Sequence, residues 1–129
     1  MKLLLDTHVV LWALSDPDRL SADSRALLLD PDNDLGVSAA TAWEVAIKRH
    51  LGKLEMPGTV SRWFLRAVTE LGGHWLPVRA KEAALVEGLP DHHRDPFDRI
   101  LIAQAMELGR TVITADEVFA AYPVAVLRA

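Results

Sequence analysis

Residues 91–105 read DHHRDPFDRILIAQA and place two acids, Asp95 and Asp98, three residues apart at the start of a predicted helix. Asp98 falls on the same helical face as the apolar residues four and seven positions later, Ile102 and Ala105. We expect that face to point into the protein. A buried carboxylate must raise its pKa, pair with a cation or bind a metal ion, so Asp98 is a candidate functional residue.

Asp95 has a simpler explanation than Asp98. It precedes Pro96, and an acid followed by proline is typical of a helix N-cap with proline at the first helical position. An acid in the first turn, such as Asp98, also suits the helix dipole. Capping does not explain why Asp98 lies on the apolar face. Whether Asp95 is a cap, a metal ligand or a support for a ligand stays open at this point.

The composition indicates one compact unit. The chain has 129 residues, 50% of them hydrophobic, which is enough for a substantial core, so we expect a single domain over residues 1–129. The absence of cysteine excludes thiol chemistry and fits the cytoplasm, our expected location. No stretch is long and apolar enough for a signal peptide or a membrane span. The net charge of −4 argues only weakly against nucleic-acid binding, because acids clustered at a metal site would contribute to it.

Short apolar runs alternate with helical patterns along the whole chain. We expect strands at residues 2–5, 35–38, 74–78, 111–114 and 124–128. We expect helices at residues 7–15, 21–30, 39–52, 59–72, 80–87, 96–108 and 116–122. Strands separated by helices predict a mainly parallel sheet of about five strands with helices on both faces, which is a three-layer α/β/α sandwich.

Polar side chains follow three of the predicted strands. Asp6 follows the first strand, Ser38 the second, and Thr114 with Asp116 ends the fourth. The carboxyl ends of parallel strands meet at one edge of a sheet, where the ligands of such folds bind. We therefore expect these side chains to lie close together.

Glu44 is a further acid that the sequence places near this edge. It lies on the helix after Ser38, within a stripe that we predict to face inward, formed by Ala40, Trp43, Ile47 and Leu51. A surface ion pair with Lys48 would also explain Glu44, and Asp116 alone could cap a short helix. Such explanations suffice for single acids, but together the acids predict one carboxylate pocket, formed by Asp6, Glu44, Asp98 and Asp116.

A pocket of carboxylates predicts a metal ion and phosphodiester chemistry. Clustered carboxylates repel one another, and oxygen ligands select Mg²⁺ or Mn²⁺ over zinc. Such ions activate water for phosphodiester hydrolysis. The chain has no glycine-rich nucleotide loop and no GxSxG elbow. An aspartyl phosphatase is the weaker alternative, because His8 stands where such enzymes usually carry a second acid. We therefore favour a nuclease.

The histidines and tryptophans receive plainer interpretations. His92 and His93 are adjacent on a polar loop, and their spacing alone does not make a zinc site, so we interpret them as loop residues or phosphate contacts. Three tryptophans lie in helical apolar patterns and are expected in the core rather than as stacking platforms for bases: Trp12, Trp43 and Trp63. Trp75 is expected in a strand.

These motifs resemble the PIN domain family and, within it, the VapC-type toxins of toxin–antitoxin pairs. The resemblance rests on the first strand ending in Asp6 and Thr7, and on SAATAWEVAIKRHLGKL (38–54), HRDPFDRILIAQAMELG (93–109) and TVITADEVF (111–119). It implies an endoribonuclease dependent on Mg²⁺ or Mn²⁺, with Asp6 and Asp98 as the most direct metal ligands and Glu44 and Asp116 completing the site. Residues expected to support these acids are Thr7, Ser38, Asp95 and Thr114.

The resemblance also implies partners. VapC-type toxins form homodimers, and a small antitoxin places its C-terminal segment, often with an arginine, across the acidic pocket. We expect RNA as the substrate and no membrane association. Basic residues near the site are candidate RNA contacts: Lys48, Arg49, Arg94 and Arg99. Two alternatives stay open, namely an RNA- or protein-binding module of the same fold with little or no catalysis, and a housekeeping RNA-processing nuclease.

Overall fold

A five-stranded parallel sheet forms the centre of the computed structural model, which describes residues 1–129. Its strands are β1 (Lys2–Leu5), β2 (Asp34–Ser38), β3 (His74–Leu76), β4 (Thr111–Thr114) and β5 (Val126–Arg128), in the order β3-β2-β1-β4-β5. In the central strand β1 the three consecutive leucines, Leu3 to Leu5, are fully buried, as expected for a strand covered on both faces. The predicted parallel sheet is confirmed.

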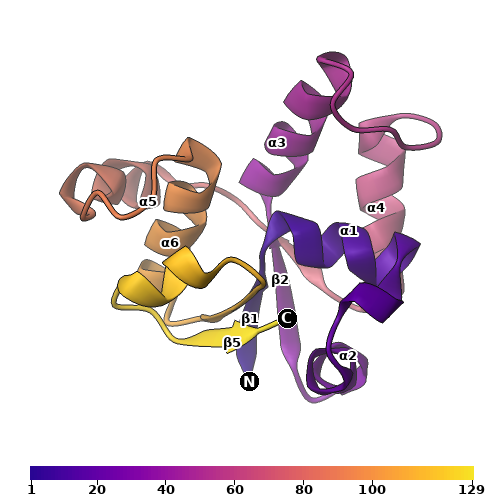
Figure 1. The fold of residues 1–129 in the computed structure, drawn as a ribbon, viewed down its shortest axis with the longest axis horizontal. Helices are drawn as coiled ribbons and strands as arrows, with labels where there is room; N and C mark the ends of the chain where they lie inside the picture. Colours follow the sequence, from indigo (N-terminus) through magenta and orange to yellow (C-terminus); the bar gives the residue numbers. More distant parts are fainter.

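Helices cover both faces of this sheet (Figure 1). They are α1 (Thr7–Ser15), α2 (Ala22–Leu29), α3 (Ala39–His50), α4 (Val60–Leu71), α5 (Ala80–Leu85) and α6 (Pro96–Leu108), with short 3-10 turns η1 (Pro17–Arg19), η2 (Val86–Gly88) and η3 (Glu117–Ala121). Side chains alternate between the faces of a strand, so Leu3 and Leu5 pack with α1, α2 and α4, whereas Leu4 packs with α6 and η3. This is the predicted three-layer sandwich.

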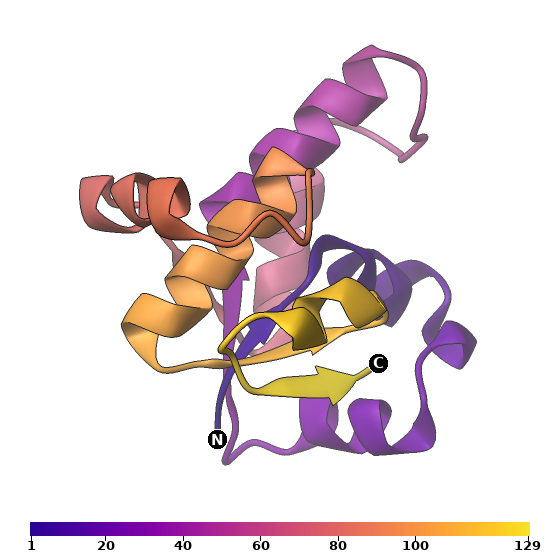
Figure 2. The same cartoon turned by 60° about the vertical axis from the view of Figure 1, so that its left-hand side comes forward.

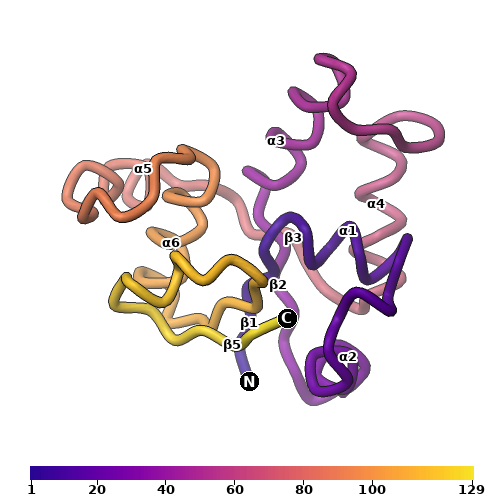
Figure 3. Tube along the Cα trace, viewed as in Figure 1, coloured from indigo at the N-terminus to yellow at the C-terminus, as the bar shows by residue number.

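The register aligns the carboxyl ends of the central strands. Leu5 at the end of β1 pairs with Val37 of β2 and with Ile113 of β4. The backbone N–H of Asp6 donates to the carbonyl of Ile113 at 3.0 Å, which continues the alignment by one residue. The polar residues that follow these strands therefore share one edge, as predicted, and the Cα trace in Figure 3 shows how distant parts of the chain return to it.

The outward side of α3 departs from the sequence-based expectation. Ala40 and Glu44 are buried as predicted, at 3% and 2% exposed, but Trp43 is 58% exposed and Leu51 60%, so the predicted stripe holds only for Ala40 and Glu44. Leu51 is exposed because α3 rises past the edge of the sheet beside α6 (Figure 2), whereas Trp43 lies in the covered first turns but on their outward side. Trp43 instead packs edge-on against Phe97, with ring centroids 5.0 Å apart.

The other tryptophans follow the predictions more closely. Trp12 and Trp63 are partly buried against the core that contains Leu3 and Leu5, and Trp75 lies in β3. None of the helices has the length and apolar character needed to cross a membrane.

Candidate functional site

Asp6 is held at the junction of β1 and α1. Asp6 is 4% exposed, and its side chain caps α1 by accepting the Thr7 backbone N–H at 2.7 Å. The second carboxylate oxygen accepts the Thr114 hydroxyl at 2.7 Å. Burial raises the pKa of Asp6, although the hydrogen bonds from Thr114 and Thr7 work in the opposite direction. Asp6 is thus a buried acid with a fixed orientation.

Glu44 reaches the same edge from α3. Its Oε1 accepts the Thr7 hydroxyl at 2.7 Å, and its Oε2 forms an ion pair with Lys48 one turn later. Burial alone would lower the pKa of Lys48, but its hydrogen bond to Glu44 and the charges of Glu44, Asp95 and Asp98 outweigh burial and raise it. The predicted ion pair of Glu44 with Lys48 is therefore present, but it is not a surface pair, because Glu44 is buried.

Asp95 and Asp98 divide the start of α6 between them. Oδ1 of Asp95 accepts the backbone N–H groups of Phe97 at 2.8 Å and Asp98 at 3.1 Å, so Asp95 caps the helix. Asp98 lies on the first turn above the fully buried Leu101 and Ile102. Burial raises the pKa of Asp98 to about 8, with further contributions from the charges of Asp6, Asp95, Glu44 and Asp116. The contribution of these charges to the pKa requires the acids to lie close to Asp98.

Asp116 comes from the segment after β4. Its backbone N–H donates to the Thr114 hydroxyl oxygen at 2.9 Å, and its Oδ1 accepts the Val118 N–H at 3.0 Å, which caps η3. The Thr114 hydroxyl thus links Asp6 and Asp116, two acids that are 110 positions apart in the chain. The Asp116 side chain is 36% exposed, so it lies nearer the solvent than Asp6 or Glu44.

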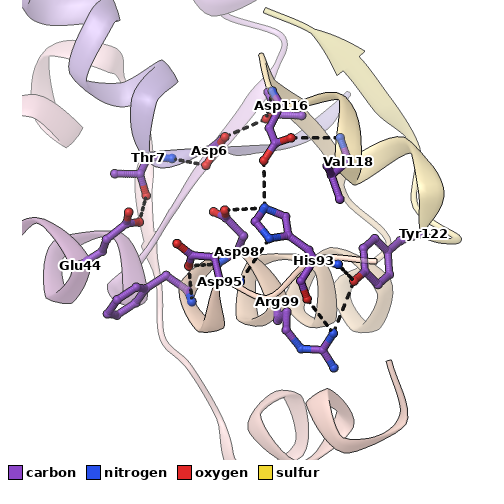
Figure 4. A network of polar contacts seen from close by, with 12 residues as sticks. Asp6, Thr7, Glu44, His93, Asp95, Asp98, Arg99, Asp116, Val118 and Tyr122 are labelled. Carbon is purple, nitrogen blue, oxygen red and sulfur yellow. Dashed lines mark hydrogen bonds and ion pairs between the residues drawn. The ribbon is translucent and has the colours of Figure 1, made fainter. Parts of the chain in front are cut away.

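The four predicted acids lie around a common space at this edge (Figure 4). Their carboxylates supply an oxygen-rich donor set that suits a hard divalent cation. The raised pKa values of Asp6 and Asp98 have burial as their first cause, with nearby carboxylate charges adding to the increase. A bound divalent cation would offset that repulsion, so the residues fit the metal site implied by the sequence.

His93 also contributes to this site, and the sequence did not reveal it. Its Nε2 lies 2.8 Å from Asp98 Oδ2 and 2.9 Å from Asp116 Oδ2 (Figure 4). The neighbouring His92 instead packs edge-on against Tyr122, with ring centroids 5.2 Å apart. Adjacency of two histidines carries no information on which ring faces the acids. The only sequence signal was the position of His93 two residues before Asp95.

A predicted supporting residue, Ser38, and a predicted RNA contact, Arg99, have structural roles of their own. Ser38 caps α3 by accepting the Ala40 N–H at 3.0 Å, and it is fully buried. Arg99, a candidate RNA contact, instead donates to loop carbonyls, including Pro90 at 2.9 Å and His93 at 3.2 Å. Its guanidinium is occupied in holding this loop. Arg99 therefore has a structural role in the loop, and its contact with RNA stays a prediction.

The remaining candidate RNA contacts differ in exposure and in pairing. Arg94 is exposed and lines a hollow together with His93 and Arg99. Arg49 is half-buried near the end of α3, and Lys48 is occupied by Glu44. The charge of Lys48 is therefore largely neutralised by Glu44.

Comparisons with known proteins agree with this fold. The family model described as the PIN domain matches residues 3–125. Ribonuclease VapC22 of Mycobacterium tuberculosis is 31% identical over 117 residues, covering 88% of this chain and 86% of the relative. Among solved structures, VapBC2 from Rickettsia felis bound to a promoter DNA fragment gives a TM-score of 0.74 at 14% identity, covering 99% of this chain and 98% of the other. FitAcB from Neisseria gonorrhoeae gives 0.62 at 24% identity, covering 97% and 96%.

Proposed function

The chain belongs to the PIN domain family, and on this basis we propose that it is a divalent-metal-dependent endoribonuclease that acts as the toxin of a toxin–antitoxin pair. One observation carries the proposal, namely the convergence of buried or partly buried acids from β1, α3, α6 and the segment after β4. The relative named as a ribonuclease supports RNA as the substrate. Residues 1–129 would act as one nuclease domain.

We assign Mg²⁺ or Mn²⁺ to this site, because the acids offer oxygen ligands and these ions prefer them. When bound, the ion would activate water and stabilise the charge that develops on the phosphodiester. Asp6 and Asp98 would hold it most directly, with Glu44 and Asp116 completing the set. The Thr7 and Thr114 hydroxyls fix Glu44 and Asp6 in their orientations.

RNA would approach across the exposed side of the site near Asp116. Arg94 and Arg49 are the basic residues that we propose as phosphate contacts, because neither has an ion pair in the protein. Lys48 is a weaker candidate for a phosphate contact, because it already neutralises Glu44. A chain with net charge −4 would depend on such local cations for substrate binding.

A protein antitoxin is the partner that we propose. Its basic side chain would enter the acid cluster, where a charge-assisted hydrogen bond to a carboxylate is strong. An apolar groove of about 600 Å³ lies between α3 and α4 and is lined by Trp43, Phe64, Leu65 and Trp75 among others. It lies beside the site, because Trp43 also contacts Phe97 at the start of α6. The VapBC assemblies among the structurally similar proteins support such a partner. A homodimer in the cytoplasm is part of the same proposal.

RNA cleavage by the purified chain tests the proposal. We expect cleavage with Mg²⁺ or Mn²⁺ and none with excess chelator, and we expect Asp98→Asn to lower the rate by about 100-fold or more, because it removes a metal ligand. Asp95→Asn is the matched control, because it removes an acid only three residues away and asparagine also caps helices. This variant should keep most of the cleavage rate.

Two results would count against the proposal. Cleavage that persists in chelator, or at full rate in the Asp98→Asn chain, would exclude the proposed site. RNA binding without cleavage in every metal would instead favour the non-catalytic module. The toxin role is tested separately, by expressing the chain in bacteria and measuring whether growth arrest requires Asp98.

A further inference from the structure

His93 is held in place by its backbone as well as by its ring. Its N–H donates to the Tyr122 hydroxyl at 2.7 Å, and its carbonyl accepts from Arg99 at 3.2 Å. Tyr122 and Arg99 also bind the carbonyl of Pro90, at 2.8 Å and 2.9 Å, so the loop that carries His93 is fixed at two points. Such support indicates that the position of this imidazole matters.

The ring nitrogens of His93 face different kinds of partner. Nδ1 accepts the backbone N–H of Asp95 at 3.2 Å, which requires a lone pair on Nδ1. The hydrogen-bond network therefore assigns the ring proton of the neutral imidazole to Nε2. This Nε2–H donates to Asp116 Oδ2 at 2.9 Å and lies 2.8 Å from Asp98 Oδ2. The N–H edge thus lies between two carboxylates from different elements.

This arrangement is unsuited to metal ligation by His93, although its Nε2 and the carboxylate oxygens of Asp98 and Asp116 lie within 4.8 Å of one another. A histidine that binds a metal through one nitrogen normally donates a hydrogen bond from the other, usually to a carboxylate or carbonyl. Here the other nitrogen faces an N–H group, which cannot accept. His93 is therefore placed to hold the ligands and not to replace them.

We infer that His93 is a positioning residue. Its Nε2–H holds the Oδ2 atoms of Asp98 and Asp116 in place, so that the free lone pairs of these carboxylates are available to the metal. The inference rests on the proposed metal-dependent function. Without this N–H, the two like-charged carboxylates would separate, and the site would bind a divalent ion less tightly. Loss of hydrogen-bond partners behind metal ligands typically lowers metal affinity by about 10- to 100-fold.

Mn²⁺ binding to the full chain, measured by electron paramagnetic resonance, tests this role. We expect His93→Leu to weaken Mn²⁺ binding by about 10- to 100-fold. His93→Gln should recover most of the affinity, because its amide keeps an N–H donor but is a poor metal ligand. His92→Gln is the matched control and should bind Mn²⁺ like the original chain, because His92 faces Tyr122. Thermal unfolding checks that each variant is folded.

The nitrogen coupling of the bound Mn²⁺ separates the two possible roles of His93. A positioning residue predicts no directly coordinated ¹⁴N in the original chain, whereas a strong ¹⁴N coupling that disappears in His93→Gln would make His93 a ligand and overturn the inference. Unchanged affinity in His93→Leu, or a Gln variant as weak as the Leu variant, would also overturn it. Failure of Mn²⁺ to bind the original chain at all would instead refute the proposed metal site, and this role with it.

Discussion

Asp98 combines burial with the charges of its neighbours. Burial raises its pKa to about 8, and the charges of Asp6, Asp95, Glu44 and Asp116 act in the same direction. At pH 7 and without metal, Asp98 is therefore protonated in most molecules. A divalent cation must displace that proton, so metal binding at this residue is coupled to pH.

The raised pKa of Asp98 predicts how stability depends on pH without metal. Between about pH 4 and pH 8 the folded chain holds a proton on Asp98 that the unfolded chain has released, so the free energy of unfolding falls as pH rises. One such proton contributes at most about 1.4 kcal/mol per pH unit. Asp98→Asn should flatten this dependence, and the raised pKa of Asp6 should leave a smaller slope of the same sign.

Denaturant unfolding in chelator at pH 5, 6, 7 and 8 measures the effect. The lowered pKa of Asp34 does not interfere, because its stabilising contribution is lost only as pH falls through the acid range below about pH 4. Parallel slopes for the original chain and the Asp98→Asn chain would contradict the assignment of a raised pKa to Asp98.

Single residues differ in how far the sequence determines their role. The cap at Asp95 follows from its neighbour Pro96, since capping is a local property. The burial of Asp98 follows from helical periodicity. The contact of His93 with Asp116 does not follow from either, because it depends on how the loop before α6 folds back against η3. Residues on irregular loops have no periodicity that would reveal the direction of their side chains.

At the scale of elements, α3 shows where periodicity is insufficient. Its buried residues are confined to its first two turns: Ala40, Thr41, Glu44 and Val45. Apolar residues further along, such as Leu51, lie beyond the sheet and are exposed. The pattern of apolar residues indicates a helical face, but it does not state what lies opposite that face. The helix and the burial of Glu44 were therefore predictable, and the exposure of Trp43 and Leu51 was not.

Arg110 connects elements at the opposite edge of the sheet. It follows α6 and is 8% exposed, and its guanidinium donates to the carbonyl of Leu3 in β1 at 3.1 Å and to the carboxylate of Asp34 in β2 at 3.2 Å. Asp34 in turn pairs with His74 of β3. One side chain thus joins the beginnings of neighbouring strands.

We expect Arg110→Met to lower the free energy of unfolding by about 1–3 kcal/mol, because it removes the donor from the buried Leu3 carbonyl and one of the two partners of the Asp34 carboxylate. Arg25→Met is the control, since the Arg25–Asp18 pair is exposed and should contribute little. Denaturant unfolding of both variants at pH 7 provides the comparison. Equal stability of the two variants would show that Arg110 does not stabilise the sheet.

At the scale of the whole molecule, topology brings together acids from residues 6, 44, 98 and 116. The sequence was sufficient to predict this, because Asp6 and Asp116 follow strands that share their carboxyl edge, and helical periodicity turns Glu44 and Asp98 inward. It was insufficient for the distances, since these depend on the packing of α3 and α6 above the sheet. The site is thus a property of the complete fold, and an ion bound there would link four separate segments.

Such a link predicts that divalent metal stabilises the whole chain against heat. An ion that binds only the folded state adds about 2.7 kcal/mol to the free energy of unfolding when its concentration is 100 times its dissociation constant. We therefore expect Mg²⁺ or Mn²⁺ to raise the melting temperature progressively with concentration. Asp98→Asn and Asp6→Asn should each remove most of this rise, because each takes one ligand from the site.

Differential scanning fluorimetry against metal concentration measures this response. Asp23→Asn provides the control, because Asp23 is an exposed acid on α2, away from the sheet edge that carries the cluster, and its loss should leave the metal response intact. A rise in melting temperature that persists in the Asp98→Asn chain would mean that the ion binds elsewhere. If Asp23→Asn abolished the response as fully as Asp98→Asn, the stabilisation would reflect overall charge and not a site at the carboxyl edge of the sheet.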